Sequence, residues 1–289
     1  MNEAEKLDQY YTKFDIALQC YQTFQKVLSK IVNPNFIFIE PSAGSGVFLQ
    51  AISDNYPKQG FDISPVYSTI QKNDFLQQDF RELLSSEEKQ KHIVFIGNPP
   101  FGRKSELAIQ FVNRCFEFSD VLGFILPLQF RKWSAQSKIT PLANLILDMK
   151  LPENSFEFEG KDYKVRCCFQ VWALEGFSDQ FQNLRILEKP NTYHNDFRMY
   201  QYNRTEDAKK FFDYDWDFAV PRQGYVDYSF KAYSKSQCDM KQQWIFFKAK
   251  DDEVLKKLLA IDFEKLSCKN IGIPGFGKAD VIEEYKRRN

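Results

Sequence analysis

The sequence has few of the residues that build metal centres and disulfide frameworks. It holds only two histidines, His92 and His194, and its six cysteines form no CxxC pair. Zinc sites and redox motifs need clustered ligands at short fixed spacings, so neither is predicted. Scattered cysteines instead indicate reduced thiols, as in a cytoplasm. We therefore expect a cytoplasmic protein without a metal centre.

The chain also lacks a long apolar run and an excess of charge of either sign. No segment approaches the roughly 20 apolar residues of a membrane span. The polar opening MNEAEKLDQYYTK does not resemble a secretory signal. The 39 basic residues are balanced by 39 acidic ones, which excludes a non-specific polycation but not a local basic surface. We expect no association with a membrane.

Apolar and aromatic residues are plentiful, with 43% hydrophobic residues and 29 phenylalanines among 289 positions. This content supports a sizeable core, and the length exceeds a typical domain of about 100–150 residues. The composition changes after about Glu175: aromatic residues interleaved with acidic ones crowd together at 211–218, and aromatic and polar residues alternate at 221–235. We therefore expect a larger domain over residues 1–175 and a smaller α+β region over residues 176–289.

Short apolar strands alternate with helical patterns in the first domain. Strands are predicted at 36–39, 59–63, 93–96 and 121–126, with a further sheet edge near Asp74. Helices are predicted at 14–31, 47–53 and 106–116. This alternation predicts an α/β fold with a doubly wound, mostly parallel sheet covered on both faces. A later hairpin is expected to pair 156–158 with 163–172, and further helices are expected at 251–259 and at the carboxyl terminus.

A glycine turn follows the first predicted strand, in FIFIEPSAGSGVFL. Glu40 ends the strand, and Gly44 and Gly46 allow a ligand to approach the backbone closely. Ligands of doubly wound sheets bind outside the carboxyl ends of the strands. The third glycine of the GxGxxG fingerprint is missing, which argues against NAD. Asp62 ends the next strand and is placed to accept hydrogen bonds from ribose hydroxyls.

A third strand end offers Asp74 and Phe75. Asp74 would accept from the exocyclic amine of a cofactor base, and Phe75 would stack on that base. The same dipeptide recurs at Asp79 and Phe80. The sequence alone leaves both pairs open as contacts of a cofactor base, and we favour Asp74.

The most informative stretch is HIVFIGNPPFG, where a buried strand ends in two rigid prolines. Asn98 offers a side-chain carbonyl, Pro99 a backbone carbonyl held rigid by Pro100, and Phe101 a flat ring. Together they form a socket for a planar base with an exocyclic amine, whose stacking is worth about 1–3 kcal/mol. Accepting both N–H bonds leaves the nitrogen lone pair free to attack an electrophilic methyl group.

These motifs in this order resemble the amino-methyltransferases that use S-adenosylmethionine. The closest resemblance is to DNA adenine-N6 methyltransferases of the gamma arrangement, in which cofactor motifs precede NPPF and target recognition follows. It covers about the first 175 residues, including an opening motif at 7–17, and implies a Rossmann-like methyltransferase fold. The cofactor residues it implies are Tyr11, Thr12, Glu40, Pro41, Ala43, Gly44, Gly46, Asp62, Asp74 and Phe75.

The resemblance also implies contacts with a nucleic-acid substrate. Phe169, in CCFQVW, is the candidate ring against a base that has been flipped out of the duplex. Arg103 and Lys104 follow the NPPF loop and are candidates for phosphate contacts. Arg222 is a candidate for reading base edges, so residues 176–289 are expected to serve target recognition or an accessory role.

Several alternatives stay open. DNA is favoured over RNA as the substrate, although NPPF also suits RNA adenine-N6 methylation. Cytosine-N4 and protein glutamine methylation rank lower, because those families more often carry Ser at the position of Asn98 and Tyr at that of Phe101. An alternative of a different class is that the chain is a non-catalytic subunit of a methyltransferase complex. A restriction enzyme or other partner subunit is a possible partner.

Overall fold

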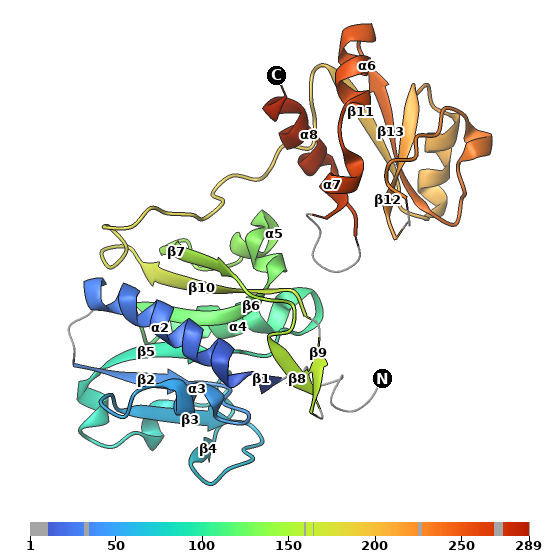
Figure 1. Ribbon diagram of the computed structural model, residues 1–289. Coiled ribbons are helices and arrows are strands. Elements are labelled where there is room, and N and C mark those ends of the chain that lie inside the picture. The colour runs from blue at the N-terminus through green and yellow to red at the C-terminus, as the bar shows by residue number, and fades with distance from the viewer. Residues whose placement is uncertain are drawn as a thin grey trace. The chain divides into compact units, whose positions relative to one another are not determined.

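A computed structural model of the chain describes residues 11–31, 35–158, 160–163, 165–224, 227–268 and 274–288. The chain divides into two compact units, residues 1–188 and 189–289 (Figure 1). The boundary therefore lies beyond residue 175, where the composition changes. Residues 176–188 belong to the first unit because they bond to it. The amide of Leu184, for example, donates to the carbonyl of Leu145 at 2.7 Å.

Seven strands form the main sheet of the first unit, in the order β4-β3-β2-β5-β6-β10-β7. The five strands from β4 to β6 pair in parallel, whereas β10 is antiparallel to both β6 and β7. The parallel part has the 3-2-1-4-5 order of doubly wound folds, so the predicted α/β class is confirmed. The strands are β2 (Phe36–Glu40), β3 (Lys58–Asp62), β4 (Ile70–Lys72), β5 (His92–Gly97), β6 (Val121–Pro127), β7 (Ala143–Lys150) and β10 (Cys167–Leu174).

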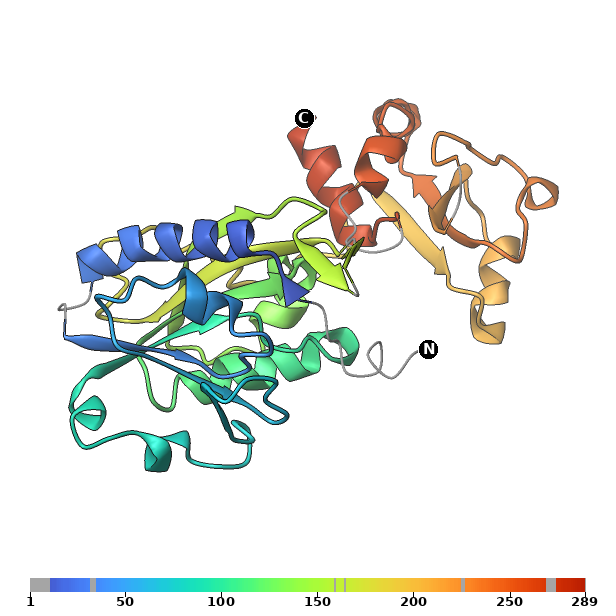
Figure 2. The ribbon, with the colours of Figure 1, turned by 60° about the horizontal axis from the view of Figure 1, so that its bottom comes forward.

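Helices cover both faces of this sheet, as Figure 2 shows. Helices α2 (Phe14–Ile31) and α3 (Val47–Ala51) pack on one face, and α4 (Glu106–Cys115) packs on the other. Two hydrophobic cores result, because alternate side chains of the central strands enter one core or the other. The short elements of this unit are α5 (Trp133–Gln136), η1 (Phe80–Leu83), η2 (Glu88–Gln90), η3 (Arg103–Ser105) and η4 (Leu128–Arg131).

A second, three-stranded sheet joins the chain start to a hairpin. Its order is β1-β8-β9, with β1 at Tyr11–Thr12, β8 at Phe156–Phe158 and β9 at Lys161–Tyr163. The predicted hairpin is therefore right in its first strand and wrong in its second. The segment from Cys167 onward is buried on both faces and enters the main sheet instead. Residues 159 and 164 lie outside the described ranges.

The second unit is a smaller α+β fold, as expected. Its antiparallel sheet has the order β11-β13-β12. Among the described residues of the alternating stretch 221–235, only 221–223 lie in a strand, so that strand prediction is largely wrong there. The elements are β11 (Phe197–Tyr202), η5 (Glu206–Asp213), β12 (Phe218–Gln223), η6 (Lys235–Gln237), β13 (Gln243–Ala249), α6 (Asp252–Leu259), α7 (Phe263–Ser267) and α8 (Lys278–Arg287).

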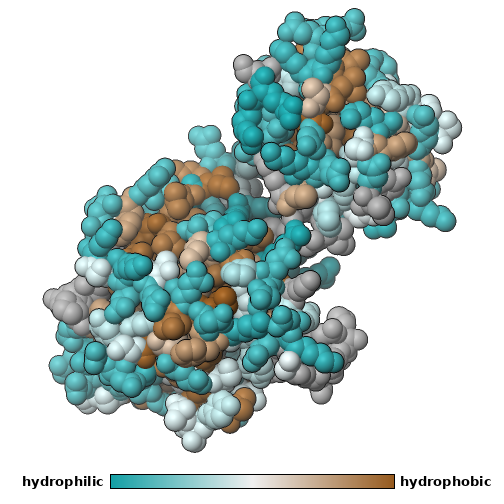
Figure 3. Space-filling model, viewed as in Figure 1, coloured by the Kyte–Doolittle hydropathy of each residue, from teal (hydrophilic) through white to brown (hydrophobic). Residues whose placement is uncertain are grey.

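Hydrophilic residues cover most of the visible surface of each unit, with apolar residues showing between them (Figure 3). Within the described ranges, no helix has the length and apolar character needed to cross a membrane.

Candidate active site

The carboxyl edge of the main sheet collects the predicted site residues. Glu40 is the last residue of β2 and Asp62 the last of β3. Asp74 follows β4 after one intervening residue, and Asn98 follows β5 directly. Because these four strands are parallel neighbours, their carboxyl ends meet at one edge.

The glycine turn after β2 is fixed by a carboxylate from β3. Gly44 and Gly46 have φ values of 50° and 70°, in the left-handed region that favours glycine. One oxygen of Asp62 accepts from the Gly44 amide at 2.8 Å, and the other accepts from the Ser64 amide at 2.8 Å. Each carboxylate oxygen has a second lone pair, so Asp62 can orient the turn and still accept a ligand hydroxyl.

Glu40 is a buried carboxylate with an unpaired oxygen. Its side chain is 2% exposed, and its Oε2 has no hydrogen-bond partner in the described part of the chain. Burial raises the pKa of Glu40 well above its usual value, and the nearby negative charge of Asp62 raises it further. Such a group favours a cationic ligand, which would restore its charged form.

Strand β1 brings the start of the described chain to this edge. Tyr11 lies over the glycine turn, since a Cβ built on Gly44 would lie 3.6 Å from Tyr11 Cε1. Thr12 is buried, and its Oγ1 has no partner among the described residues. Pairing of Tyr11 with Glu157 in β8 holds the strand there. Residues 7–10 of the predicted opening motif lie outside the described ranges.

The NPPF loop begins beside Glu40. A Cβ built on Gly97 would lie 3.3 Å from Glu40 Cγ, so glycine permits this close approach. The Oδ1 of Asn98 is buried and has no partner in the part of the chain described, while Ser42 Oγ donates to its backbone carbonyl at 3.5 Å. Phe101 is half-buried and packs on the core that contains α2.

Unpartnered buried oxygens concentrate at this edge. Four of the six buried side-chain atoms without a partner, counted over the described ranges, belong to Thr12, Glu40, Asn73 and Asn98. Buried polar groups in folded proteins nearly always have a hydrogen-bond partner. The donor and acceptor pattern of the edge therefore fits a bound polar ligand, with Pro41, Ala43 and the two turn glycines forming its backbone wall.

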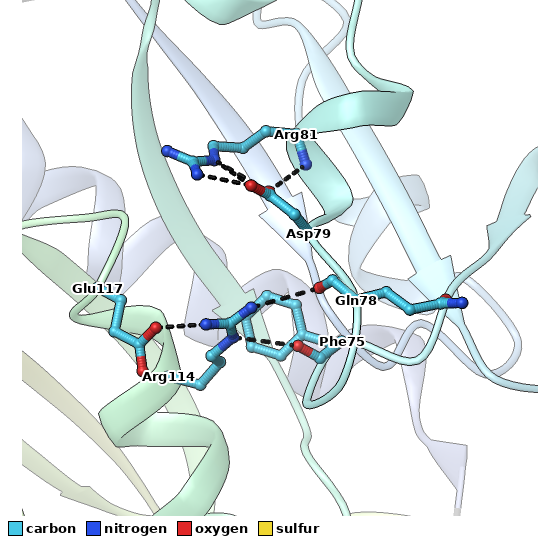
Figure 4. Close-up of polar contacts among 6 residues, drawn as sticks. All are labelled: Phe75, Gln78, Asp79, Arg81, Arg114 and Glu117. Atoms are coloured by element: carbon cyan, nitrogen blue, oxygen red, sulfur yellow. Dashed lines mark hydrogen bonds and ion pairs between the residues drawn. The ribbon is translucent and has the colours of Figure 1, made fainter.

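The structure distinguishes Asp74 from Asp79. Both oxygens of Asp79 bond to the guanidinium of Arg81, which lowers the pKa of Asp79 (Figure 4). Arg114 donates to the carbonyls of Phe75 and Gln78, each at 3.4 Å, and fixes the intervening turn. Asp79 is therefore held by Arg81, whereas Asp74 follows β4 at the sheet edge and accepts from the Leu76 amide at 3.2 Å; the preference for Asp74 as a cofactor contact stays a prediction.

The predicted stacking role of Phe75 is wrong in this structure. Its ring is 1% exposed and packs on Phe80, Phe95 and Phe111 in the core beneath α4. Ile63, which was not singled out from the sequence, follows Asp62 directly and is 64% exposed. The sequence signal for an exposed Ile63 was its position after the carboxyl end of the strand rather than within the strand.

Phe169 also belongs to the core. It is fully buried in β10 and packs edge-on against Phe24 of α2, with ring centroids 6.2 Å apart. Its ring therefore does not face a bound base, which corrects the prediction. Tyr163, at the end of β9, is half-buried and packs on the same core as Phe101. It is the aromatic residue of this region that the sequence reasoning overlooked.

The remaining candidates separate into exposed and internal groups. Arg103 and Lys104 are exposed in η3, directly after the NPPF loop. Arg222 is half-buried in the second unit, where Nε donates to the Phe276 carbonyl at 3.1 Å and Nη1 to Gln243 Oε1 at 2.8 Å. Its guanidinium therefore serves the fold of that unit, which corrects its assignment to base reading.

Several solved structures resemble part of the chain. A modification subunit of a proposed type I restriction enzyme from Vibrio vulnificus has a TM-score of 0.39 and 15% identity, over 57% of this chain and 44% of that chain. A type I restriction–modification methyltransferase subunit from Streptococcus thermophilus has a TM-score of 0.41 and 15% identity, over 57% of this chain and 45% of that chain. A proposed RNA methyltransferase from Pyrococcus horikoshii has a TM-score of 0.42 and 15% identity, over 58% of this chain and 87% of that chain.

The chain thus spans less than half the length of those two restriction–modification subunits. No known family's sequence profile matches the chain, and no curated protein sequence matches it.

Proposed function

We propose that the chain transfers a methyl group from S-adenosylmethionine to the exocyclic N6 amine of adenine in DNA. The observation that carries this proposal is that two side chains, each with a buried, unpartnered oxygen, come together at Gly97: Glu40 lies close to Gly97, and Asn98 follows Gly97 directly. One oxygen belongs to the carboxylate of Glu40 and the other to the amide of Asn98. A cation-binding group thus lies beside an amine-binding group at the end of two neighbouring strands.

The acidic side of the edge fits the cofactor. S-adenosylmethionine, when bound, supplies an electrophilic methyl group on a sulfonium. Glu40 would accept from its α-ammonium group, and Asp62 would accept from the ribose hydroxyls. Asp74 would accept from the adenine amine, and the exposed Ile63 would cover one face of that base.

The NPPF loop would bind the target amine. Asn98 Oδ1 and the Pro99 carbonyl would each accept one N–H, which aims the nitrogen lone pair away from both oxygens. Phe101 would stack on the base, and Tyr163 replaces Phe169 as the candidate for its other face. A base within a duplex cannot reach this loop without being flipped out, at a cost of a few kcal/mol. Target recognition would fall to residues 189–289.

The test is methyl transfer from radiolabelled S-adenosylmethionine to unmethylated genomic DNA and, in parallel, to total RNA and a protein extract. Asn98→Ala is the inactive variant, and Asn55→Ala, at an exposed position, is the matched control. Labelled nucleic acid is then digested to identify the modified nucleoside.

The proposal predicts N6-methyladenine in DNA from the wild type and from Asn55→Ala, but not from Asn98→Ala. Label confined to RNA or protein would overturn DNA as the proposed substrate but would retain the proposed transfer of a methyl group to an amine. Absence of label in all three substrates, with the cofactor bound, would overturn the proposal for this chain acting alone and would favour a partner subunit.

A further inference from the structure

The carboxyl edge of the main sheet is divided by charge. On one side, the ends of β2, β3 and β4 carry the acidic residues Glu40, Asp62 and Asp74. Lys72 is a basic residue on this side. On the other side, basic residues follow or flank β5, β6, β10 and β7. These basic residues, here called the basic half, are Arg103, Lys104, Arg131, Lys132, Lys150 and Arg166. The NPPF loop stands at the division.

Strand register places the basic half on the same edge as the NPPF loop. Strand β6 runs parallel to β5 and ends at Pro127, which faces Cys167 at the start of β10. Next along, Cys168 faces Lys150, the last residue of β7. Arg166 directly precedes β10. The ends of β6 and β7 and the start of β10 therefore line one continuous border beside the loop.

Part of the basic half is neutralised and part is not. Asp148 pairs with Arg131 at 2.8 Å, and Glu153 pairs with Arg166 at 3.3 Å. Within the described ranges, the side chains of Arg103, Lys104 and Lys150 make no hydrogen bond or ion pair, and all three residues are exposed. Glu106, exposed in the first turn of α4, is the nearest other carboxylate in sequence. The border therefore keeps a positive charge although the whole chain is neutral.

The spacing of these charges suits a nucleic-acid backbone. Neighbouring strands lie about 4.8 Å apart, so the ends of β5 and β7, three strands apart, are separated by about 14 Å. This is the rise of about four phosphates along one B-form strand, at 3.4 Å each. A charged border of this length can contact phosphates on both sides of a nucleotide held in the NPPF loop.

We infer that the basic half holds the backbone of the substrate strand, with Arg103 and Lys104 contacting phosphates on one side of the target nucleotide and Lys150 on the other. This inference rests on the proposed function and specifies its substrate as a polyanionic strand. Phosphate contacts position the strand without reading its sequence. The acidic side of the edge would repel the same strand and direct it away from the cofactor.

The test measures binding of a fluorescently labelled 20-nucleotide single strand to the full chain, by anisotropy at several salt concentrations. The variants are the double substitution Arg103→Gln with Lys104→Gln, and Lys150→Gln alone. Lys89→Gln is the matched control, because Lys89 is exposed in η2, which precedes β5 at the opposite edge of the sheet. Lys104→Arg tests whether charge alone suffices, and thermal unfolding verifies that each variant folds.

For a single strand, each lost phosphate contact lowers the slope of log affinity against log salt by about 0.7. The double variant should lose about 1.4 and Lys150→Gln about 0.7, with severalfold weaker binding at low salt. Lys89→Gln and Lys104→Arg should match the wild type. Wild-type slopes in the folded basic-half variants would overturn the inference, even if methyl transfer is observed. Reduced slopes without any methyl transfer would support the inference and overturn the proposed reaction.

Discussion

The two units treat their polar side chains in opposite ways. Over the described ranges, all six buried side-chain atoms without a hydrogen-bond partner lie in the first unit. In the second unit, comparable groups bond to their own fold. Asp217 accepts from the Ala249 amide at 2.7 Å and pairs with Lys248 at 3.0 Å, and Arg222 bridges to Phe276.

This difference teaches where each unit can hold a ligand. Unsatisfied buried oxygens carry a desolvation cost of about 1–3 kcal/mol each, which a bound polar ligand can offset. Of the two units, the first therefore holds the buried oxygens that a polar ligand could satisfy. Substitutions at the sheet edge should change ligand binding, and substitutions of the paired groups should change stability.

The largest effect on stability is expected at Phe169. Phe169→Ala should lower the free energy of unfolding by about 3–5 kcal/mol, because it removes a buried ring from the core. Tyr163→Ala should instead raise KM for the nucleic acid severalfold with a smaller loss of stability. Chemical denaturation and steady-state kinetics of both variants measure this contrast. A raised KM in Phe169→Leu, with little loss of stability, would restore Phe169 as a base contact.

Glu40→Gln should weaken cofactor binding by at least ~100-fold, since losing one partner of a buried ion pair costs about 3–5 kcal/mol. The same change should raise the unfolding midpoint of the free protein near neutral pH. The raised pKa of Glu40 means that its contribution to stability is present at low pH and is lost as pH rises through that value. Calorimetry with S-adenosylmethionine and thermal unfolding between pH 5 and pH 8 test both effects.

The control for this substitution is Glu106→Gln, at an exposed carboxylate. It should change neither cofactor affinity nor the pH dependence of unfolding. Wild-type cofactor affinity should rise with pH, because the bound ammonium needs the ionised form of Glu40. Equal affinities across that range would contradict the assignment of Glu40.

A smaller effect is expected in the second unit. Arg222→Gln should destabilise the protein by about 1–3 kcal/mol, because buried backbone and side-chain acceptors lose their donor. Turnover per folded molecule should stay unchanged, and Arg198→Gln, at an exposed position of β11, should leave both unchanged. If Arg222→Gln methylates a different target sequence and its stability is unaltered, the assignment of Arg222 to recognition of base edges would be restored.

The smallest effects should separate the two Asp-Phe pairs. Asp74→Ala should weaken cofactor binding about tenfold, the loss of one charge-assisted hydrogen bond of roughly 1.5 kcal/mol. Asp79→Ala should leave that affinity unchanged and cost less than about 1 kcal/mol of stability, because its pair with Arg81 is partly exposed. Titration calorimetry decides between them, and a reversed result would exchange the two assignments.

Sequence patterns predicted the positions at the sheet edge because those depend on local signals. Apolar runs, a glycine turn and two prolines fix where β2 and β5 end and which residues follow. The same patterns missed β7 and misplaced Phe75, Phe169 and Arg222. Whether an aromatic ring faces a core or a ligand, and whether a guanidinium is already paired, depends on segments distant in sequence, such as α2 for Phe169 and the Phe276 loop for Arg222.

Under the proposed function, the close approach of Glu40 to Gly97 would link two binding events. A Cβ built on Gly97, the residue before Asn98, would lie 3.3 Å from Glu40 Cγ, so a movement of the methyl-donor site would act on the residue next to Asn98. Any change that cofactor binding makes in affinity for the target strand must then appear, by the same factor, as a change that the strand makes in affinity for the cofactor. An additional methyl group in Gly97→Ala would enter this contact and alter the coupling itself, whereas the charges at either site would be unchanged.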